Sequence, residues 1–164
     1  WENQLHDEPG LNLIYETKWR FSSEHARTDW GLDLIPYAGV SLGNVFTYVN
    51  TGFEIRAGYA LPADFGASLI RPRGESHSWR PAFNFFVFIS AEGRAIARDI
   101  TLDGNSFRDS PSIEKEHFVY DIMGGFGVGT RGLQLTYTQA RRSPDFDGQD
   151  DPQDFGSIAV SIFF

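Results

Sequence analysis

The sequence predicts an all-β protein, an antiparallel transmembrane β-barrel of the outer-membrane kind. Three observations lead to this fold class. Apolar and polar residues alternate with a period of two through most of the chain; glycine, at 17 residues, and aromatic residues, at 15%, are abundant; and no apolar run approaches the roughly 20 residues that a membrane helix needs. Such an alternation sends successive side chains to opposite faces of a sheet.

The first three predicted strands each carry their charges on one face only. Leu11–Phe21 alternates leucine and aromatic residues with glutamate, lysine and arginine. Trp30–Leu42 alternates leucine, alanine and valine with aspartate and serine. After the tight "SLGN" turn, Val45–Leu61 alternates valine, phenylalanine and isoleucine with Glu54 and Arg56. Each segment therefore reads as a strand with one apolar and one polar face.

Four further strands follow the same rule. Pro81–Arg98 sets phenylalanine, valine and isoleucine against asparagine, glutamate and arginine. His117–Gly129 sets aromatic residues and isoleucine against aspartate, methionine and glycines, and the "GTRG" turn leads into Leu133–Arg141, which alternates leucine and tyrosine with glutamine and threonine. Phe155–Phe164 alternates isoleucine and valine with serine and alanine and ends on an aromatic residue.

Two architectures share this alternation: a soluble barrel, such as a lipocalin-like binder, turns its apolar face inward, whereas an outer-membrane barrel turns it toward lipid. Several predicted strands exceed the roughly 9–11 residues that span a bilayer, and tyrosine and tryptophan gather toward strand ends, as in an aromatic girdle. These features favour the membrane barrel. The charged faces then form a hydrated network in the lumen that pairs Glu16, Glu54 and Glu92 with Lys18, Arg56 and Arg94.

Seven strands are an odd number, and an open wall would leave unpaired edges in lipid. We therefore expect the chain to be the C-terminal part of a larger barrel, with residues 1–10 as the tail of an extracellular loop and residues 11–164 as part of one barrel domain. If the last strand ends in the periplasm, "SLGN", "DGNSFRDSPSIEKE" and "RSPDFDGQDDPQD" are extracellular and the other connections are periplasmic. The long connection after Leu61 could fold back.

The composition and the motifs restrict the chemistry. With 22 acidic and 14 basic residues, a net charge of −8 and no cysteine, the chain is unsuited to nucleic acid and to thiol chemistry. It contains no G-x-S-x-G elbow and no H-E-x-x-H pair, and its acidic loop lacks the spacing of a calcium-binding EF-hand. His6, next to Asp7 and Glu8, is a weak candidate for a general base, with a solvated loop histidine as the alternative.

Four segments carry a family resemblance: "WENQLHDEPGLNLIYETKWR", "AGVSLGNVFTYVNTGFEIRAGYALPADFG", "ARDITLDGNSF" and "YTQARRSPDF". Together they resemble the LpxR-type lipid A deacylase family of Gram-negative outer membranes. The resemblance implies a twelve-stranded barrel that hydrolyses the 3′-linked acyloxyacyl ester of lipid A. It also implies a divalent cation, usually calcium, a histidine base, and lipopolysaccharide as the substrate.

In that family the catalytic histidine precedes the "W-x-N-Q" motif and the metal-binding residues lie near the N-terminus. The resemblance therefore implies a catalytic histidine upstream of Trp1 and no metal ligand in this chain, and we expect the isolated chain to be inactive. It implies rim residues that cradle the acyl chains: Asn3, Gln4, Asn12, Asn44, Arg98 and Asp99.

Further expected partners are membrane lipid and the barrel-assembly machinery, the latter through the last strand. The full-length protein is expected to be a monomer. The alternative function is a barrel without catalysis, either a passive pore or a structural protein.

Overall fold

The alternating segments form one antiparallel sheet. The computed structural model describes residues 7–24, 29–66, 82–107, 110–146, 148–149 and 151–162. Its sheet has the order β1-β3-β4-β5-β6-β7-β8, with β2 also paired to β3. The elements are β1 (Asn12–Lys18), β2 (Phe21–Glu24), β3 (Trp30–Gly43), β4 (Phe46–Tyr59), β5 (Phe83–Asp99), α1 (Ile100–Asp103), β6 (Phe118–Thr130), β7 (Leu133–Arg142) and β8 (Gln153–Ile162).

The first predicted strand is divided into β1 and β2, which pair with the same neighbour in one continuous register. Lys18 lies opposite Tyr37 in β1, and Phe21 lies opposite Leu34 in β2. Between them Trp19 donates its backbone N–H to Pro36 over 3.0 Å, but Pro36 has no N–H to donate in return. The missing hydrogen bond interrupts the ladder at this point, so eight strands occupy the seven predicted positions.

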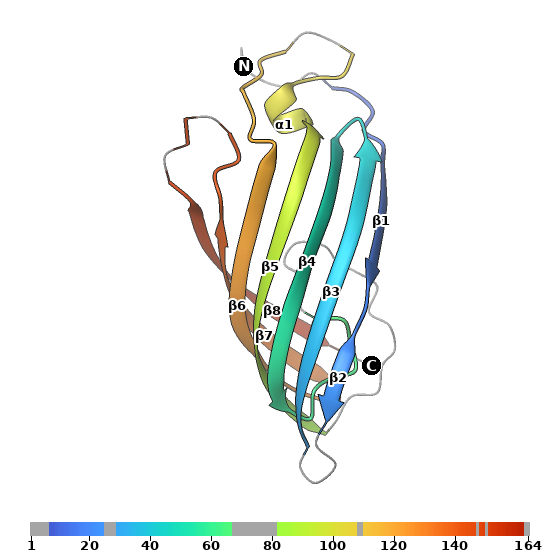
Figure 1. The fold of residues 1–164 in the computed structure, drawn as a ribbon, viewed down its shortest axis with the longest axis vertical. Helices are drawn as coiled ribbons and strands as arrows, with labels where there is room; N and C mark the ends of the chain where they lie inside the picture. The colour runs from blue at the N-terminus through green and yellow to red at the C-terminus, as the bar shows by residue number, and fades with distance from the viewer. Residues whose placement is uncertain are drawn as a thin grey trace.

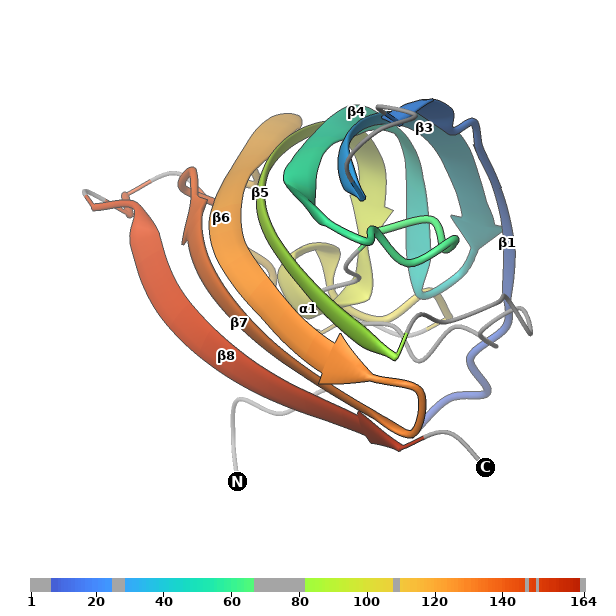
Figure 2. The same ribbon diagram turned by 90° about the horizontal axis from the view of Figure 1, so that it is seen from below.

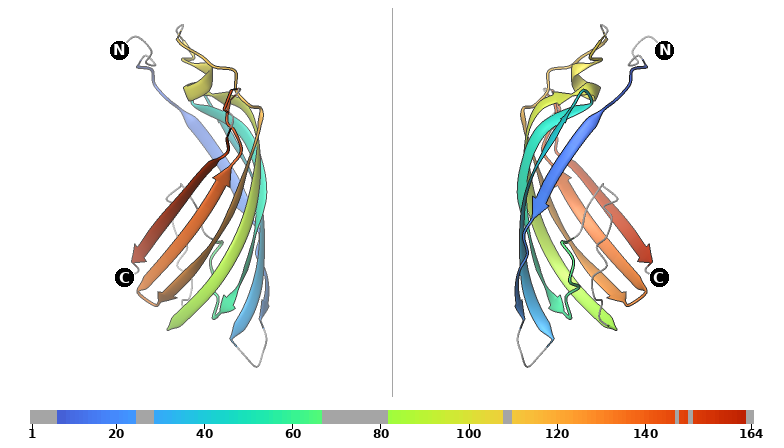
Figure 3. Two further views of the ribbon diagram at one scale, coloured as in Figure 1. Left: turned by 90° about the vertical axis from the view of Figure 1, so that its left-hand side faces the viewer. Right: turned by 90° about the vertical axis from the view of Figure 1, so that its right-hand side faces the viewer.

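The sheet curves into a wall whose two edges are β1 and β8 (Figure 2). Residues 7–11, α1 and the connections β3–β4, β5–β6 and β7–β8 lie at one end of the wall, and β8 finishes at the other end (Figures 1 and 3). We call these the α1 end and the β8 end. The strand order and pairing agree with the predicted division of the connections between two ends, and residues 25–28 and 67–81 of two of these connections lie outside the described residues.

The two faces of the wall have opposite chemistry. Large apolar side chains are exposed on the convex face, among them Val49, Ile89 and Ile158 at 55%, 54% and 72%. The concave face buries polar side chains: Asp33 and Asn84 have no exposed surface. A soluble barrel would bury the apolar face, whereas a membrane barrel turns it to lipid and keeps polar groups in the lumen. The sheet has the membrane arrangement.

A β-bulge near the end of β5 resets the alternation there. Tyr48 of β4 faces Ile96, but the preceding residue, Thr47, faces Arg98, so Ala97 is the extra residue. Because one residue has been added, Ile96 and Asp99 both line the concave side, and Arg98 is left at the rim. Among the described residues the only helix, α1, has four residues, and no helix there is long and apolar enough to cross a membrane.

Candidate functional site in the lumen and at its rim

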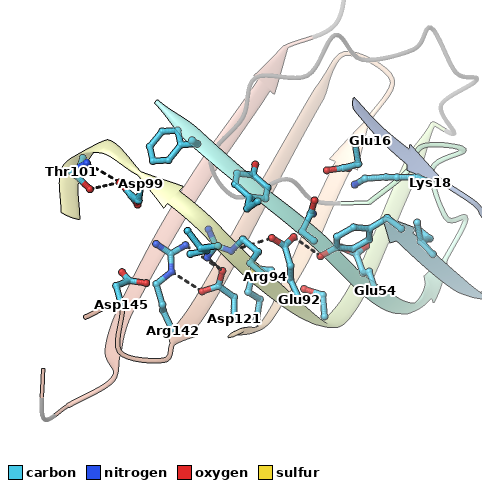
Figure 4. A pocket seen from close by; sticks show the side chains of 18 of the residues that line it. Glu16, Lys18, Glu54, Glu92, Arg94, Asp99, Thr101, Asp121, Arg142 and Asp145 are labelled. Atoms are coloured by element: carbon cyan, nitrogen blue, oxygen red, sulfur yellow. Dashed lines mark hydrogen bonds and ion pairs between the residues drawn. The ribbon is translucent and has the colours of Figure 1, made fainter. Parts of the chain in front are cut away.

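The concave side of the wall encloses a cavity of about 500 Å³ toward the α1 end. Its lining comes from β1, β3 to β7, α1, Phe65 after β4 and the β7–β8 connection. Figure 4 shows charged side chains from several of these elements pointing into it. The alternation explains the charged part of this lining. Successive side chains of a strand point to opposite faces, and in these strands the polar ones face inward.

Five side chains on four strands form a connected charged cluster in this cavity, which we call the upper cluster: Tyr37, Glu92, Arg94, Asp121 and Arg142. Asp121 lies directly opposite both Glu92 and Arg142 in the strand register. It accepts hydrogen bonds from Arg94 at 2.6 Å and from Arg142 at 2.8 and 3.2 Å. Two arginines therefore offset the two carboxylates that the register brings face to face.

The upper cluster continues across the cavity to β3. Arg94 lies 3.5 Å from Glu92, and the Tyr37 hydroxyl donates to the Glu92 carboxylate over 2.9 Å (Figure 4). The predicted pairing of Glu92 with Arg94 is thus present, but the sequence interpretation missed Asp121 as the carboxylate between two arginines. The cluster cross-links strands β3, β5, β6 and β7. We assign it a structural role, because its carboxylates are already engaged by arginine and tyrosine donors.

Asp145 lines the same cavity just beyond the end of β7. Its backbone carbonyl accepts the N–H of Glu116 over 3.0 Å, which ties the β7–β8 connection to the β5–β6 connection. Burial raises the pKa of the Asp145 carboxyl above its usual range, and the attraction of Arg142 and Arg94 does not offset that effect. Asp145 is therefore more easily protonated than an exposed aspartate.

Three of the predicted rim residues, Asn12, Asn44 and Arg98, come together at the α1 end. Asn12 accepts the N–H groups of Val45 and Phe46 over 3.3 and 3.1 Å and so caps the β3–β4 turn. Asn44 accepts the N–H of residue 11 and donates to the carbonyl of residue 9, both over 2.7 Å. Their amides therefore hold loop backbone.

Arg98 connects this turn to the segment after α1. It donates to the carbonyl of Asn44 over 3.0 Å, to the carbonyl of Gly104 over 3.0 Å and to the Ser106 hydroxyl over 2.9 Å. The Glu8 carboxylate accepts the N–H of Ser106 through both oxygens, at 3.1 and 3.0 Å. We call Glu8, Asn12, Asn44, Arg98 and Ser106 the rim brace, because together they join three segments distant in sequence.

Desolvation acts to raise the pKa of Glu8, but hydrogen bonds from the Asn105 side chain, Ser106 and Phe107 outweigh it, so the pKa lies below its ordinary value. Glu8 and Ser106 were not predicted from the sequence. Their contact joins a side chain to a backbone amide across 98 residues, and no local pattern signals such a contact.

Asp99 lies apart from the brace and caps α1. Its carboxylate accepts the Thr101 N–H over 2.9 Å and the Thr101 hydroxyl over 2.6 Å, as N-cap residues do. Asp103, the last residue of α1, accepts the Asp99 N–H and a hydrogen bond from Lys115. Desolvation of Asp103 is outweighed by these bonds, so its pKa is lowered.

The remaining sequence predictions for the site fall on the first six residues. Asn3 and Gln4, expected at the rim, and His6, the weak candidate for a base, lie outside the described residues. So does Trp1, upstream of which the family resemblance puts the catalytic histidine. These expectations therefore stay predictions.

The described residues contain no group of three or more histidine, aspartate or glutamate side chains that could hold a metal ion. Calcium prefers six to eight oxygen ligands, several of them from carboxylates. The described part of the chain therefore does not fit the cation that the family resemblance implies.

Comparison with known proteins places this geometry in a family. A family model described as "Outer membrane protein LpxR" matches residues 1–164, the whole chain. The chain belongs to the LpxR family. Among solved structures, LpxR from Salmonella typhimurium superposes on all of this chain with a TM-score of 0.81 at 18% sequence identity. The match covers 55% of the Salmonella chain, so this chain spans little more than half of that protein. No curated protein matches the sequence.

Family membership and the matching fold identify the sheet as wall of an outer-membrane β-barrel, located in the bacterial outer membrane. The exposed apolar convex face and the polar concave face are then its lipid side and its lumen side. This agrees with the resemblance that the four sequence segments carry.

Proposed function

We propose that the protein carrying this chain is a lipid A deacylase, which hydrolyses the 3′-linked acyloxyacyl ester of lipid A in the outer leaflet. The observation that carries the proposal is the family match over residues 1–164. The arrangement of the wall supports it, because a lipid substrate must reach the site from the convex face or the rim. The upper cluster, which fills part of the lumen with mutually paired charges, speaks against a passive pore.

In this proposal the chain contributes wall and rim, and the groups that perform the hydrolysis lie elsewhere in the protein. The convex face holds the enzyme at the depth of the acyl chains through burial of apolar surface. The rim brace fixes the segment of residues 8–11 against the loop after α1, at the end of the wall where we place the outer leaflet. We assign the calcium ligands and the histidine base to residues outside those described, and the isolated chain is expected to be inactive.

The proposed partners follow from the same arrangement. Lipid A and the surrounding lipid contact the convex face. The edge strand β8 presents Ile158, Val160 and Ile162 at more than half exposure, and we propose it as the strand that the barrel-assembly machinery engages. The completed barrel would act as a monomer, since a closed barrel has no free edge to pair with a second copy.

The test is mass spectrometry of lipid A after incubation with the purified full-length protein in the presence of calcium. The expected result is a species that has lost the 3′ acyloxyacyl group, and chelation of calcium should prevent its formation. The chain of residues 1–164 alone should leave lipid A unchanged. Full retention of that group by the intact protein with calcium would reject the deacylase and favour the non-catalytic barrel.

A further inference from the structure

The connection after β4 returns into the lumen at the β8 end. β4 ends at Tyr59, and Ala60 adopts a positive φ of 49°, which turns the chain. The following residues lie on the concave side of the wall (Figure 2). Leu61 is 6% exposed and packs against Phe86 and Phe88, two inward side chains of β5. A fold-back after Leu61 was an open possibility in the sequence, and its described part, residues 60–66, adopts one.

Arg56 fastens this segment to the wall. It donates to the carbonyl of Pro62 over 3.0 Å and to the carboxylate of Asp64 over 2.5 Å. The same guanidinium donates to Asp33 on β3 over 3.1 and 2.7 Å and lies over the Phe86 ring at 5.3 Å. One side chain thus binds the wall strand beside it and the segment inside the lumen at once.

Two further contacts hold the far end of the segment. Lys18 of β1 donates to the carbonyl of Phe65 over 3.1 Å. Gly66 has a φ of 85°, and a Cβ at that position would lie 2.6 Å from a carboxylate oxygen of Glu54. The positive φ favours glycine at this position, and the Glu54 carboxylate of β4 lies against it. The segment therefore rests on β1, β3, β4 and β5 together.

Burial of the charges makes the docked segment part of the stable state. The Arg56 side chain is 1% exposed and that of Asp33 has no exposed surface. A charge so deeply buried is tolerated only with its hydrogen bonds made. If the segment left the lumen, Arg56 would lose the carbonyl of Pro62 and the carboxylate of Asp64, so the docked position is favoured.

We propose that residues 60–66 are a resident plug that closes the lumen at the β8 end, with Arg56 as its latch. The cavity toward the α1 end then has a floor, formed in part by Phe65, and does not continue to the other end of the barrel. The barrel is accordingly closed to ions and small solutes. This proposal concerns the lumen alone and stands whether or not the protein is a deacylase.

The test is the ionic conductance of the full-length protein in planar lipid bilayers, with the variants Arg56→Met and Asp64→Ala. Arg56→Met removes the latch while keeping much of its volume. Asp64→Ala removes the same ion pair from the plug's side, at a side chain that is 28% exposed. It is the variant to use if Arg56→Met does not fold. Arg141→Ala, which removes an exposed ion pair near the α1 end, is the matched control. The wild type and the control should carry no current, and Asp64→Ala should open channels.

A second measurement, cysteine labelling, reports the position of the plug directly. This chain contains no cysteine of its own, so within residues 1–164 only the introduced cysteine can react. Leu61→Cys should resist a membrane-impermeant maleimide, whereas Ala63→Cys, at an exposed position two residues along, should react. Adding Asp64→Ala should make Leu61→Cys reactive. A steady current through the wild type, or equal labelling of the two cysteines, would overturn the proposal, as would an Asp64→Ala variant that stays closed with Leu61→Cys protected.

Discussion

The lumen wall carries two charged clusters built from the same residue types in different surroundings. In the lower cluster, around Arg56 and Asp33, the side chains are 1% and 0% exposed, and residues 60–66 cover them. In the upper cluster, Arg94 and Arg142 are 18% and 19% exposed and face the cavity. Water can replace a lost partner in the upper cluster but not in the lower one. The difference shows that burial, more than the number of ion pairs, sets what each pair contributes.

The largest expected effect is on Arg56. Among the described residues, Arg56→Ala leaves the buried Asp33 with Arg20 and the Ser22 hydroxyl as its hydrogen-bond partners. Breaking a buried pair such as Arg56 and Asp33 costs about 3–5 kcal/mol. Arg94→Ala in the upper cluster should cost clearly less, because Asp121 keeps its two hydrogen bonds from Arg142, a side chain that is partly exposed to the cavity. Urea unfolding of the full-length protein in phospholipid vesicles measures both. Equal losses for the two variants would end the distinction between the clusters.

A charged residue introduced on the convex face sharpens the comparison. Its energetic cost shows whether that face contacts lipid, in contrast to the polar lumen. Phe53 lies midway along β4 on the convex face and is 43% exposed. Phe53→Arg should destabilise the barrel by about 2–4 kcal/mol, and Phe83→Arg at the start of β5 by about 0–1 kcal/mol, since the cost falls toward the interfaces. The same unfolding assay measures both variants. If the two cost the same, the convex face does not span the bilayer as proposed.

The stability of the upper cluster should depend on its central carboxylate, Asp121. Asp121→Asn removes the charge that Arg94 and Arg142 share and should destabilise the barrel by roughly 1.5–3 kcal/mol, the range for hydrogen bonds to charged groups. Because Arg94 and Arg142 are partly exposed to the cavity, the loss should shrink when the salt concentration is raised. Unfolding of this variant at two salt concentrations gives the answer, with Arg56→Ala as the salt-insensitive reference. A loss that is independent of salt would mean that the upper cluster is as dry as the lower one.

The sequence predicted the strands and their faces well, because a period of two is a local property that each strand displays by itself. It predicted the partners of Arg56 poorly. The interpretation paired the glutamates with the basic residues, but Arg56 binds Asp33 and Asp64. Asp33 could have been found: the two-residue turn after Gly43 fixes the register that sets Asp33 opposite Arg56. Asp64 could not, because it arrives through the fold-back.

The rim was predicted only in part. Asn12, Asn44 and Arg98 do gather at one end of the wall, yet their hydrogen bonds go to the backbone of the turn and loops. The bulge at Ala97 sends Arg98 to the rim and Asp99 to the lumen side, and nothing in the alternation marks it. Contacts between a side chain and distant backbone, such as that of Glu8 with Ser106, depend on where the loops meet in the folded barrel.

The smallest expected effect belongs to the rim brace and is local. The pKa of Glu8 is lowered in the folded protein from its ordinary value of 4.5. The bonds of its carboxylate to the Ser106 and Phe107 amides therefore contribute fully above pH 4.5. That contribution is lost as the pH falls below 4.5 through the lowered pKa of the folded state. Hydrogen exchange, corrected for the intrinsic rate at each pH, should show protection of these two amides falling in that window.

Glu8→Gln supplies the matched control for that experiment. The amide keeps an acceptor oxygen and the shape of the side chain but has no carboxyl to titrate, so the protection of Ser106 and Phe107 should be weaker and nearly independent of pH. The midpoint of global unfolding should stay where it is, because Glu8 and the two amides that it binds, Ser106 and Phe107, lie outside the wall strands. If Glu8→Gln instead shifted global unfolding as far as Arg56→Ala does, the brace would belong to the same cooperative unit as the lower cluster. The rim would then not be a separately adjustable part of the barrel.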